Sequence, residues 1–186
     1  MPTAVVPVKS MSLAKSRLAG VLDAAGRRAL AEQMLTHVIG ILREAGLSSI
    51  RIATGDRDLN ADATSAARLA EADGAVDLLL VMADLPYLSS QDIAAMIEAG
   101  RQSPVVIAEA KDGGTNALLL RPPTAIEFAF STETPSAALH AERATAAGFA
   151  PRLVRRPGLA RDIDTPADLA ALASDHAAYR VFRHVA

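Results

Sequence analysis

With 186 residues, the chain has the length of one domain with a substantial core, and we expect a single domain over residues 1–186. The net charge of −2 gives no general attraction to nucleic acid or membrane surfaces, so neither is expected as a partner. The absence of cysteine excludes disulfides, thiolate metal sites and a cysteine nucleophile. No apolar run approaches the roughly 20 residues of a membrane span, and the N-terminus is unlike a signal peptide, so we expect a cytoplasmic protein.

A β-branched run at 3–8 (TAVVPV) predicts the first strand, and a basic segment follows it directly. Lys9, Lys15 and Arg17 stand within nine residues with no acid between them. Open α/β sheets bind ligands at the carboxyl ends of their strands, so these cations are placed where an anion would be held. A solvated surface loop is the alternative interpretation.

Strand and helix patterns alternate along the rest of the chain. This alternation predicts an α/β fold with a mostly parallel sheet sandwiched by helices. The expected strands are 49–54, 76–82, 104–108, 116–120 and 152–155, and the expected helices are 23–45, 60–73, 89–101, one starting near 136, and 167–172.

Asp84 follows the most continuously apolar of these strands, 76–82 (VDLLLVM). Such a strand is typical of one covered on both faces, and Pro86 stops its pairing. Asp84 therefore stands at the carboxyl end of a central strand. A carboxylate there is a hard oxygen ligand suited to Mg²⁺, although Asp84 could equally cap a turn.

Two further segments offer donors for an anion. Gly113 and Gly114 allow the backbone to approach a ligand closely, and Thr115 adds a hydroxyl, although KDGGT could be a simple hairpin turn. Ser136 and His140 are four residues apart, hence on one helical face, with Ser136 in the first turn where backbone N–H groups attract anions. An N-cap role for Ser136 is compatible with this.

Asp162 and Asp164 alternate about Ile163, so in an extended chain the two carboxylates point the same way. They precede a strong helix start, with Thr165 as N-cap and Asp168 three residues further on.

These segments resemble the 2-phospho-L-lactate guanylyltransferase family of coenzyme F420 biosynthesis, which includes phosphoenolpyruvate and 3-phosphoglycerate guanylyltransferases. The resemblance is carried by VPVK with AKSRL, ADLP, GGTNALLL, the S-x-x-x-H pair at Ser136 and His140, and RPGLARDIDTPADL. These segments stand in family order and cover nearly the whole chain. The resemblance implies a Rossmann-like nucleotidyltransferase fold of the nucleotide-diphospho-sugar transferase type.

The resemblance also implies transfer of GMP from GTP to a phosphorylated three-carbon acid, with release of pyrophosphate and with Mg²⁺ as cofactor. The expected metal ligands are Asp84 and Asp162, with Asp164 competing for the second position. Lys15 and Arg17 would meet the triphosphate and, with Asp84, are the expected catalytic residues. The further residues expected to bind substrates are Lys9, Thr115, Ser131, Ser136 and His140.

The chain departs from the family pattern twice. The family has more chain between Gly55 and Leu59, near a part of the nucleotide pocket, and it has a glycine where Ser131 stands. Two alternative functions stay open: a molybdopterin-type cytidylyl- or guanylyltransferase, and a non-catalytic nucleotide-binding relative. The absence of glycine before Gly20 argues against the first, because that branch has a glycine-rich loop after its first strand. The acceptor acid and a homodimeric state are also left open.

Overall fold

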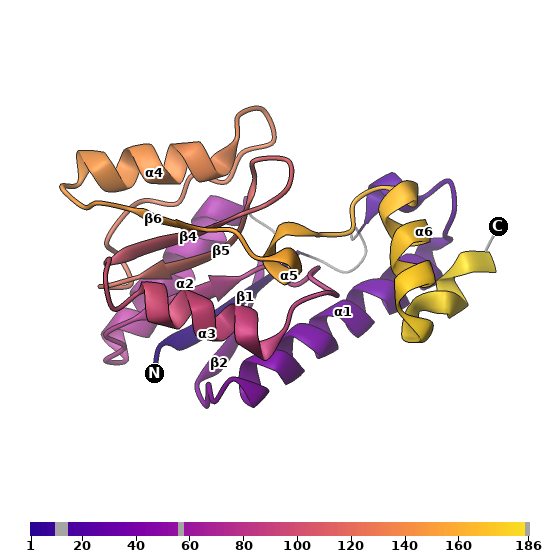
Figure 1. Ribbon diagram of the computed structural model, residues 1–186, viewed down its shortest axis with the longest axis horizontal. Coiled ribbons are helices and arrows are strands. Elements are labelled where there is room, and N and C mark those ends of the chain that lie inside the picture. The colour runs from indigo at the N-terminus through magenta and orange to yellow at the C-terminus, as the bar shows by residue number, and fades with distance from the viewer. Residues whose placement is uncertain (10–14, 56–57, 185–186) are drawn as a thin grey trace.

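Six strands form one sheet at the centre of the molecule: β1 (Thr3–Lys9), β2 (Ile50–Gly55), β3 (Leu78–Val81), β4 (Val105–Glu109), β5 (Thr115–Leu120) and β6 (Arg152–Val154). The structure is a computed structural model that describes residues 1–9, 15–55 and 58–184. The strands follow the order β2-β1-β3-β5-β4-β6, with β2 and β6 at the two edges. Figure 1 shows the sheet between helices that connect its strands.

Three pairs of neighbouring strands are parallel: β1 with β2, β1 with β3, and β4 with β6. β5 pairs antiparallel with both β3 and β4, so the sheet is mostly parallel, as predicted, with one reversed strand. The KDGGT segment that joins β4 to β5 is therefore a hairpin turn, in which the N–H of Ala110 donates to the carbonyl of Gly114.

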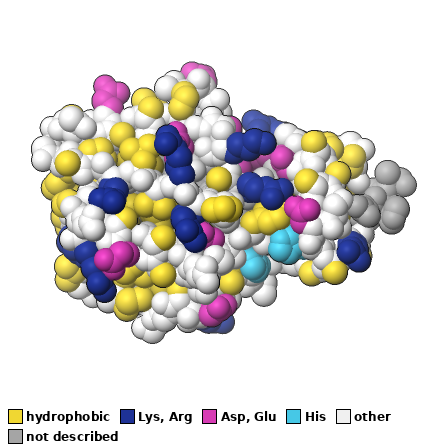
Figure 2. Space-filling model, viewed as in Figure 1, with side chains coloured by type: hydrophobic (Ala, Val, Ile, Leu, Met, Phe, Trp, Pro, Cys, Tyr) yellow, Lys and Arg dark blue, Asp and Glu magenta, His cyan; other side chains and the backbone are white. Residues whose placement is uncertain are grey.

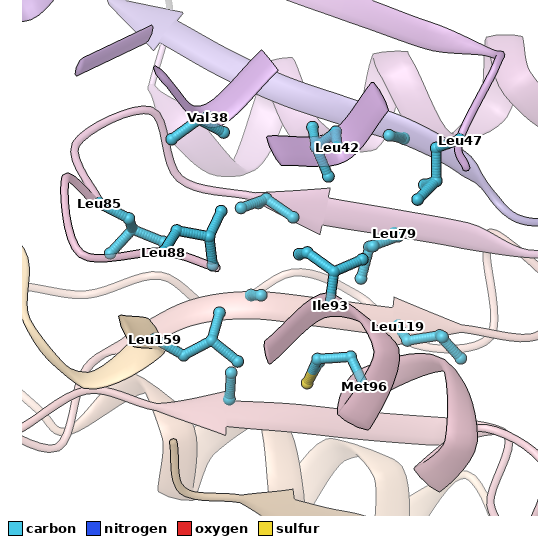
Figure 3. Packing of buried hydrophobic residues seen from close by; sticks show 14 of the residues in the cluster. Val38, Leu42, Leu47, Leu79, Leu85, Leu88, Ile93, Met96, Leu119 and Leu159 are labelled. Carbon is cyan, nitrogen blue, oxygen red and sulfur yellow. The ribbon is translucent and has the colours of Figure 1, made fainter. Parts of the chain in front are cut away.

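Helices cover both faces of the sheet. They are α1 (Ala24–Glu44), α2 (Leu59–Ala72), α3 (Ser90–Ala99), α4 (Ser136–Ala146), α5 (Pro157–Ala160) and α6 (Pro166–Asp175), with 3-10 helices η2 (Ser16–Leu18) and η3 (Ala177–His184). One face packs against α1, α3 and α5, where Val38, Leu42, Ile93 and Met96 meet Leu79 and Leu119 (Figure 3). The other face packs against the alanines of α2 and α4.

A third apolar cluster lies outside the sheet. It joins η2 and the first half of α1 to α6 and η3, and Ile163, Leu172 and Tyr179 are buried in it. In Figure 1, α6 and the C-terminal segment accordingly stand beside α1 at one end of the molecule. The consequence is that the chain leading into α6 is held firmly against the start of α1.

The predicted helix starts are confirmed at three places. The Asp23 side chain accepts the N–H of Gly26 and begins α1. Capping boxes begin α3 at Ser89 and Asp92, and α6 at Thr165 and Asp168. Each cap stabilises its helix by about 1 kcal/mol, because it satisfies backbone N–H groups that have no partner within the helix.

The structure differs from the sequence-based expectations in three details. The central strand begins at Leu78, and Val76 is 71% exposed. Ser136 is the first residue of α4, preceded by Pro135 without a side-chain cap, so it is not an N-cap. The short helix α5 and the 3-10 helix η3 were not predicted. Four residues are too few for a periodic pattern, and η3 has the tighter 3-10 repeat.

Charges of both signs are mixed on the surface. On the face shown in Figure 2, Lys and Arg side chains alternate with Asp and Glu, and no patch of one sign spreads over it. Within residues 1–9, 15–55 and 58–184, no helix is long and apolar enough to cross a membrane.

Candidate active site

Three carboxylates that are distant in sequence come together at one end of the sheet. Asp84, Asp162 and Asp164 each place one oxygen within 4.8 Å of the others, and we call them the carboxylate cluster. All three side chains are half-buried. The structure thus unites both candidates for the second ligand position with Asp84.

Asp162 and Asp164 face the cluster because the residue between them is buried. Ile163 is 1% exposed and packs in the apolar cluster beside α1, so its two neighbours point the opposite way, as predicted. The adjoining Arg161 stacks over the Tyr87 ring, 3.9 Å from its centroid, and bonds the Tyr87 hydroxyl at 3.0 Å. This contact ties the Asp162–Asp164 segment to the turn that carries Asp84.

A basic side chain neutralises part of the cluster. The Lys15 ammonium lies 2.6 Å from Asp84 Oδ2 and 2.9 Å from Asp164 Oδ1, and Arg17 Nη1 lies 3.3 Å from Asp164 Oδ2. Burial alone would lower the pKa of Lys15, but Asp84 and Asp164 outweigh it and raise the pKa, so the ammonium stays charged. The Lys15 backbone is left-handed, with φ 53°, directly before η2.

Asp162 has a different electrostatic position from its two neighbours. Its burial, with the charges of Asp84 and Asp164, raises its pKa to about 6. Lys15 and Arg17 form ion pairs with Asp84 and Asp164. The third nearby acid, Asp162, keeps the cluster favourable for a further cation.

A cleft of about 440 Å³ opens beside the cluster, over the ends of β1, β2 and β3 and between α1 and α2. Lys15, Arg17, Asp84 and Asp164 line its polar end. The sequence did not indicate the apolar remainder of the cleft, which is lined in part by Met34, Leu35, Leu59 and Met82, or the polar residues Asp62 and Thr132.

Asp62 escaped prediction because an acid in the first turn of a helix reads as a favourable partner of the helix dipole. Here its carboxyl lies against Gly55 at the end of β2, where any side chain would collide with it. Gly55 thus leaves room for the Asp62 carboxyl beside the end of β2.

A second polar group is buried behind the loop before α4. Ser136 Oγ donates to Thr115 Oγ1 at 3.1 Å, and Thr115 Oγ1 lies 3.0 Å from His140 Nδ1. His140 Nε2 accepts the N–H of Ala129 at 2.9 Å. We call Thr115, Ser136 and His140 the hydroxyl network. Thr115 and Ser136, 21 residues apart in the sequence, are thus in direct contact.

An irregularity in β5 makes this network possible. Alternation along β5 would place Thr115 on the face of Ala117 and Leu119, which pack toward α1 and α3. The register between β4 and β5 shifts at Ala108 and Glu109, so one extra residue stands in β5. Such a bulge re-aims the next side chain, and Thr115 consequently reaches Ser136 and His140 on α4.

The network lies close to the carboxylate cluster along the sheet. The N–H of Met82 donates to the carbonyl of Asn116, so Thr115 runs beside the chain that leads from Met82 to Asp84. Ser136 and Thr115 are 3% and 4% exposed, and His140 is fully buried. Burial, followed by the charge of Arg143, lowers the pKa of His140 to about 4, so the ring is neutral at pH 7.

Ser131 and Lys9 are the two remaining residues that the sequence predicts at the site. Ser131 is exposed, and its hydroxyl accepts the N–H groups of Glu133 and Thr134 in its own turn. Lys9 ends β1 opposite Gly55, but its side chain lies outside the described part of the chain.

The fold and this site define the class of protein. A crystal structure from Desulfovibrio desulfuricans G20, described as a "putative nucleotide-diphospho-sugar transferase", superposes with a TM-score of 0.76, covering 93% of this chain and 86% of that one at 17% identity. CMP:2-keto-3-deoxy-manno-octonic acid synthetase, solved with CTP, superposes with a TM-score of 0.58, covering 94% and 99% at 16% identity. The chain therefore has the nucleotidyltransferase fold.

Sequence comparison identifies the family within this class. Residues 46–181 match the family described as "Guanylyl transferase CofC like". A phosphoenolpyruvate guanylyltransferase of Rubrobacter xylanophilus is 39% identical over 95% of this chain and 96% of its own. A 2-phospho-L-lactate guanylyltransferase of Methanopyrus kandleri is 30% identical over 89% and 87%. The chain belongs to the CofC-like guanylyl transferase family.

The alignment with the Rubrobacter relative runs over 199 positions, more than the 186 residues of this chain. That relative therefore carries residues with no counterpart here. The expected place of the missing chain, between Gly55 and Leu59, includes residues 56–57, which lie outside the described residues.

Proposed function

We propose that the protein transfers GMP from GTP to a phosphorylated three-carbon acid and releases pyrophosphate, as a step of coenzyme F420 biosynthesis. The observation that carries this proposal is the meeting of Asp84, Asp162 and Asp164 with Lys15 at the end of a cleft, in a chain of this family. Phosphoenolpyruvate is the first acceptor to test, because relatives from several bacteria are named for it. 2-Phospho-L-lactate and 3-phosphoglycerate follow.

In this reaction, an oxygen of the acceptor phosphate forms a bond to the α-phosphorus of GTP, and the bond between that phosphorus and the bridging oxygen breaks. Pyrophosphate leaves with the electron pair. The acceptor phosphate is already an anion, so no residue has to remove a proton from it. The protein must instead bring two anions together, and this task needs positive charge and hydrogen-bond donors.

The carboxylate cluster has the chemistry of a Mg²⁺ site. Mg²⁺ prefers oxygen ligands at about 2.1 Å, so two ligands of one ion lie at most about 4.2 Å apart. The three oxygens lie within 4.8 Å of one another, and a small side-chain rotation would bring them to that spacing. Bound there, Mg²⁺ would screen the phosphate charges.

Lys15 and Arg17 would supply the cations for the triphosphate. In the structure Lys15 is engaged by Asp84 and Asp164, so binding nucleotide requires it to exchange carboxylate oxygens for phosphate oxygens. Arg17 is more exposed, at 65% of its side chain, and reaches the same end of the cleft. Thr115 and Ser136 would donate to the acceptor.

The test is pyrophosphate release by the purified protein with Mg²⁺ and each nucleoside triphosphate in turn, with each of the three phosphorylated acids and, separately, with a molybdopterin acceptor. Release with GTP and one acid is expected, with the guanylylated acid identified by mass spectrometry. Release with CTP and a molybdopterin acceptor would support the cytidylyltransferase alternative. Nucleotide binding without release under any combination would support a non-catalytic relative.

A further inference from the structure

The hydroxyl network contains a histidine with a fixed proton position. His140 Nε2 accepts the backbone N–H of Ala129, so this nitrogen carries no proton. The ring is neutral at pH 7 because burial lowers its pKa to about 4. The single ring proton must therefore be on Nδ1, where it is shared between Thr115 Oγ1, at 3.0 Å, and the backbone of Ser136.

The network then has one more donor proton than it has acceptors for within itself. Three can be donated: the Nδ1–H of His140 and the hydroxyl protons of Thr115 and Ser136. Thr115 Oγ1 accepts from His140 and from Ser136, so its own proton has to point to a partner outside the network. If the two hydroxyls reverse their order, the proton of Ser136 is left over instead.

The opposite tautomer would remove this surplus. Without a proton, Nδ1 would accept the hydroxyl proton of Thr115, and Ser136 would donate to Thr115. No proton would then remain for a ligand. The backbone N–H of Ala129 thus decides, through the His140 ring, whether the two hydroxyls can donate outward.

We propose that His140 is a positioning residue that makes the Thr115–Ser136 pair a donor for an anionic oxygen, a carboxylate or phosphate, of the acceptor acid. This inference rests on the proposed function. His140 is fully buried, whereas Thr115 and Ser136 are 4% and 3% exposed, so the ring itself is closed to a ligand. The substrate-binding role expected for His140 is thereby indirect.

The competing explanation is that His140 only holds the loop before α4 in place. That loop has other anchors: Arg143 donates to the carbonyl of Phe128, and the Asn60 side chain makes two hydrogen bonds to the backbone of Phe130. Asn60→Ala removes two loop anchors without touching the hydroxyl network. It is therefore the matched control for loosening of the loop.

Two substitutions separate the two nitrogens of the ring. In His140→Asn, an amide nitrogen at the place of Nδ1 can donate to Thr115, while the bond to Ala129 is lost. In His140→Gln, an amide oxygen at the place of Nε2 can accept from Ala129, while the donor to Thr115 is lost. The two variants thus each keep one of the two hydrogen bonds.

The kinetic experiment measures KM for phosphoenolpyruvate and for GTP, beside kcat, in the two variants and in Asn60→Ala. His140→Gln should raise KM for the acid at least about tenfold and change KM for GTP less than twofold, the pattern of lost ground-state binding. His140→Asn should stay within about threefold of the unmodified enzyme. Equal effects of the two variants, or the same rise in Asn60→Ala, would overturn the proposal.

A second measurement uses the unmodified protein and needs no activity. Nitrogen-15 spectra of the four histidines report the tautomer of each ring, and His140→Asn identifies the His140 signal. The proton is expected on Nδ1 at pH 7.5, and a proton on Nε2 would refute the inference. If the enzyme transfers GMP to no acid, the proposed function fails, and the spectra still decide the tautomer.

Discussion

The carboxylate cluster and the hydroxyl network lie toward the same end of the sheet, yet they are built in opposite ways. The cluster is charged and half-buried, and it is held by ion pairs that a ligand can replace. The network is neutral and buried, and it is held by hydrogen bonds within the protein. The difference indicates that the charged half rearranges on binding, whereas the neutral half is set in advance.

The largest effect is expected from Asp84→Asn, which removes a charge from the cluster and leaves its shape. Activity should fall at least about 100-fold, equivalent to about 3 kcal/mol, while the melting temperature changes by a few degrees at most. Steady-state rates and a melting curve on the same sample are the measurements.

Asp92→Asn is the matched control for that prediction. Asp92 is a buried carboxylate bonded to Arg156 and Ser89 and does not line the cleft. Its substitution should cost about 1–3 kcal/mol of stability and leave the kinetics unchanged. If Asp84→Asn behaves like Asp92→Asn, the carboxylate cluster is a structural feature and not a catalytic one.

The next largest effect concerns the pH dependence of folding, in which the two regions act with opposite sign. The pKa of His140 is lowered to about 4 in the folded protein, so the unfolded chain takes up the proton first. The stability from the neutral ring is complete above pH 6.5 and is lost as the pH falls toward 4, by on the order of 3 kcal/mol at most. The pKa of Asp162 is raised to about 6, so its ionisation lowers stability as the pH rises from 4 to 6.

Denaturant unfolding at pH 7.5 and pH 5 would separate these contributions. His140→Gln should lose less stability on acidification than the unmodified protein, and Asp162→Asn should lose more. Parallel pH profiles for all three proteins would show that neither group has the shifted pKa that its surroundings imply.

A smaller effect is expected from Lys15→Ala, which should weaken the binding of GTP and strengthen the binding of Mn²⁺. KM for GTP should rise about tenfold to 50-fold, because a cation of the triphosphate site is lost. Mn²⁺ added without nucleotide should bind more tightly than to the unmodified protein, because no ammonium competes for Asp84 and Asp164. Mn²⁺ titration followed by electron paramagnetic resonance measures the second effect.

Arg17→Ala is the milder companion variant, with an expected rise of only a few-fold in KM for GTP. Its side chain is 65% exposed and its contact with Asp164 is longer, at 3.3 Å. Exposed ion pairs of this kind contribute about 0–1 kcal/mol. An Arg17→Ala effect larger than that of Lys15→Ala would mean that Lys15 belongs to the carboxylates and Arg17 to the triphosphate.

The sequence predicted the parts of the site that depend on local patterns. The alternation of Asp162 and Asp164 about one apolar residue showed that both acids face the same way, and the family resemblance implied their role as metal ligands. Asp84 was found because a proline ends an apolar strand just after it. The hairpin at KDGGT was also within reach, since five residues are too few for the crossover that a parallel strand would need.

The parts that were missed depend on contacts between distant segments. Lys15 was expected at the triphosphate, and nothing in its neighbourhood shows that it pairs with residues 69 and 149 positions away. The bulge that turns Thr115 toward α4 leaves no mark in the sequence NALLL. Burial of His140 likewise follows from the loop that folds over it.

The central strand gains its second neighbour late in protein synthesis. β3 pairs with β1 on one side, but its other edge waits for β5, because the strand between them in the chain, β4, lies further out in the sheet. Until the ribosome has made residues 115–120, the apolar segment LLLV has an open edge that other chains could join. Nascent chains and fragments that stop before Thr115 should therefore depend on chaperones, and the tight hairpin ends this exposure as soon as it emerges.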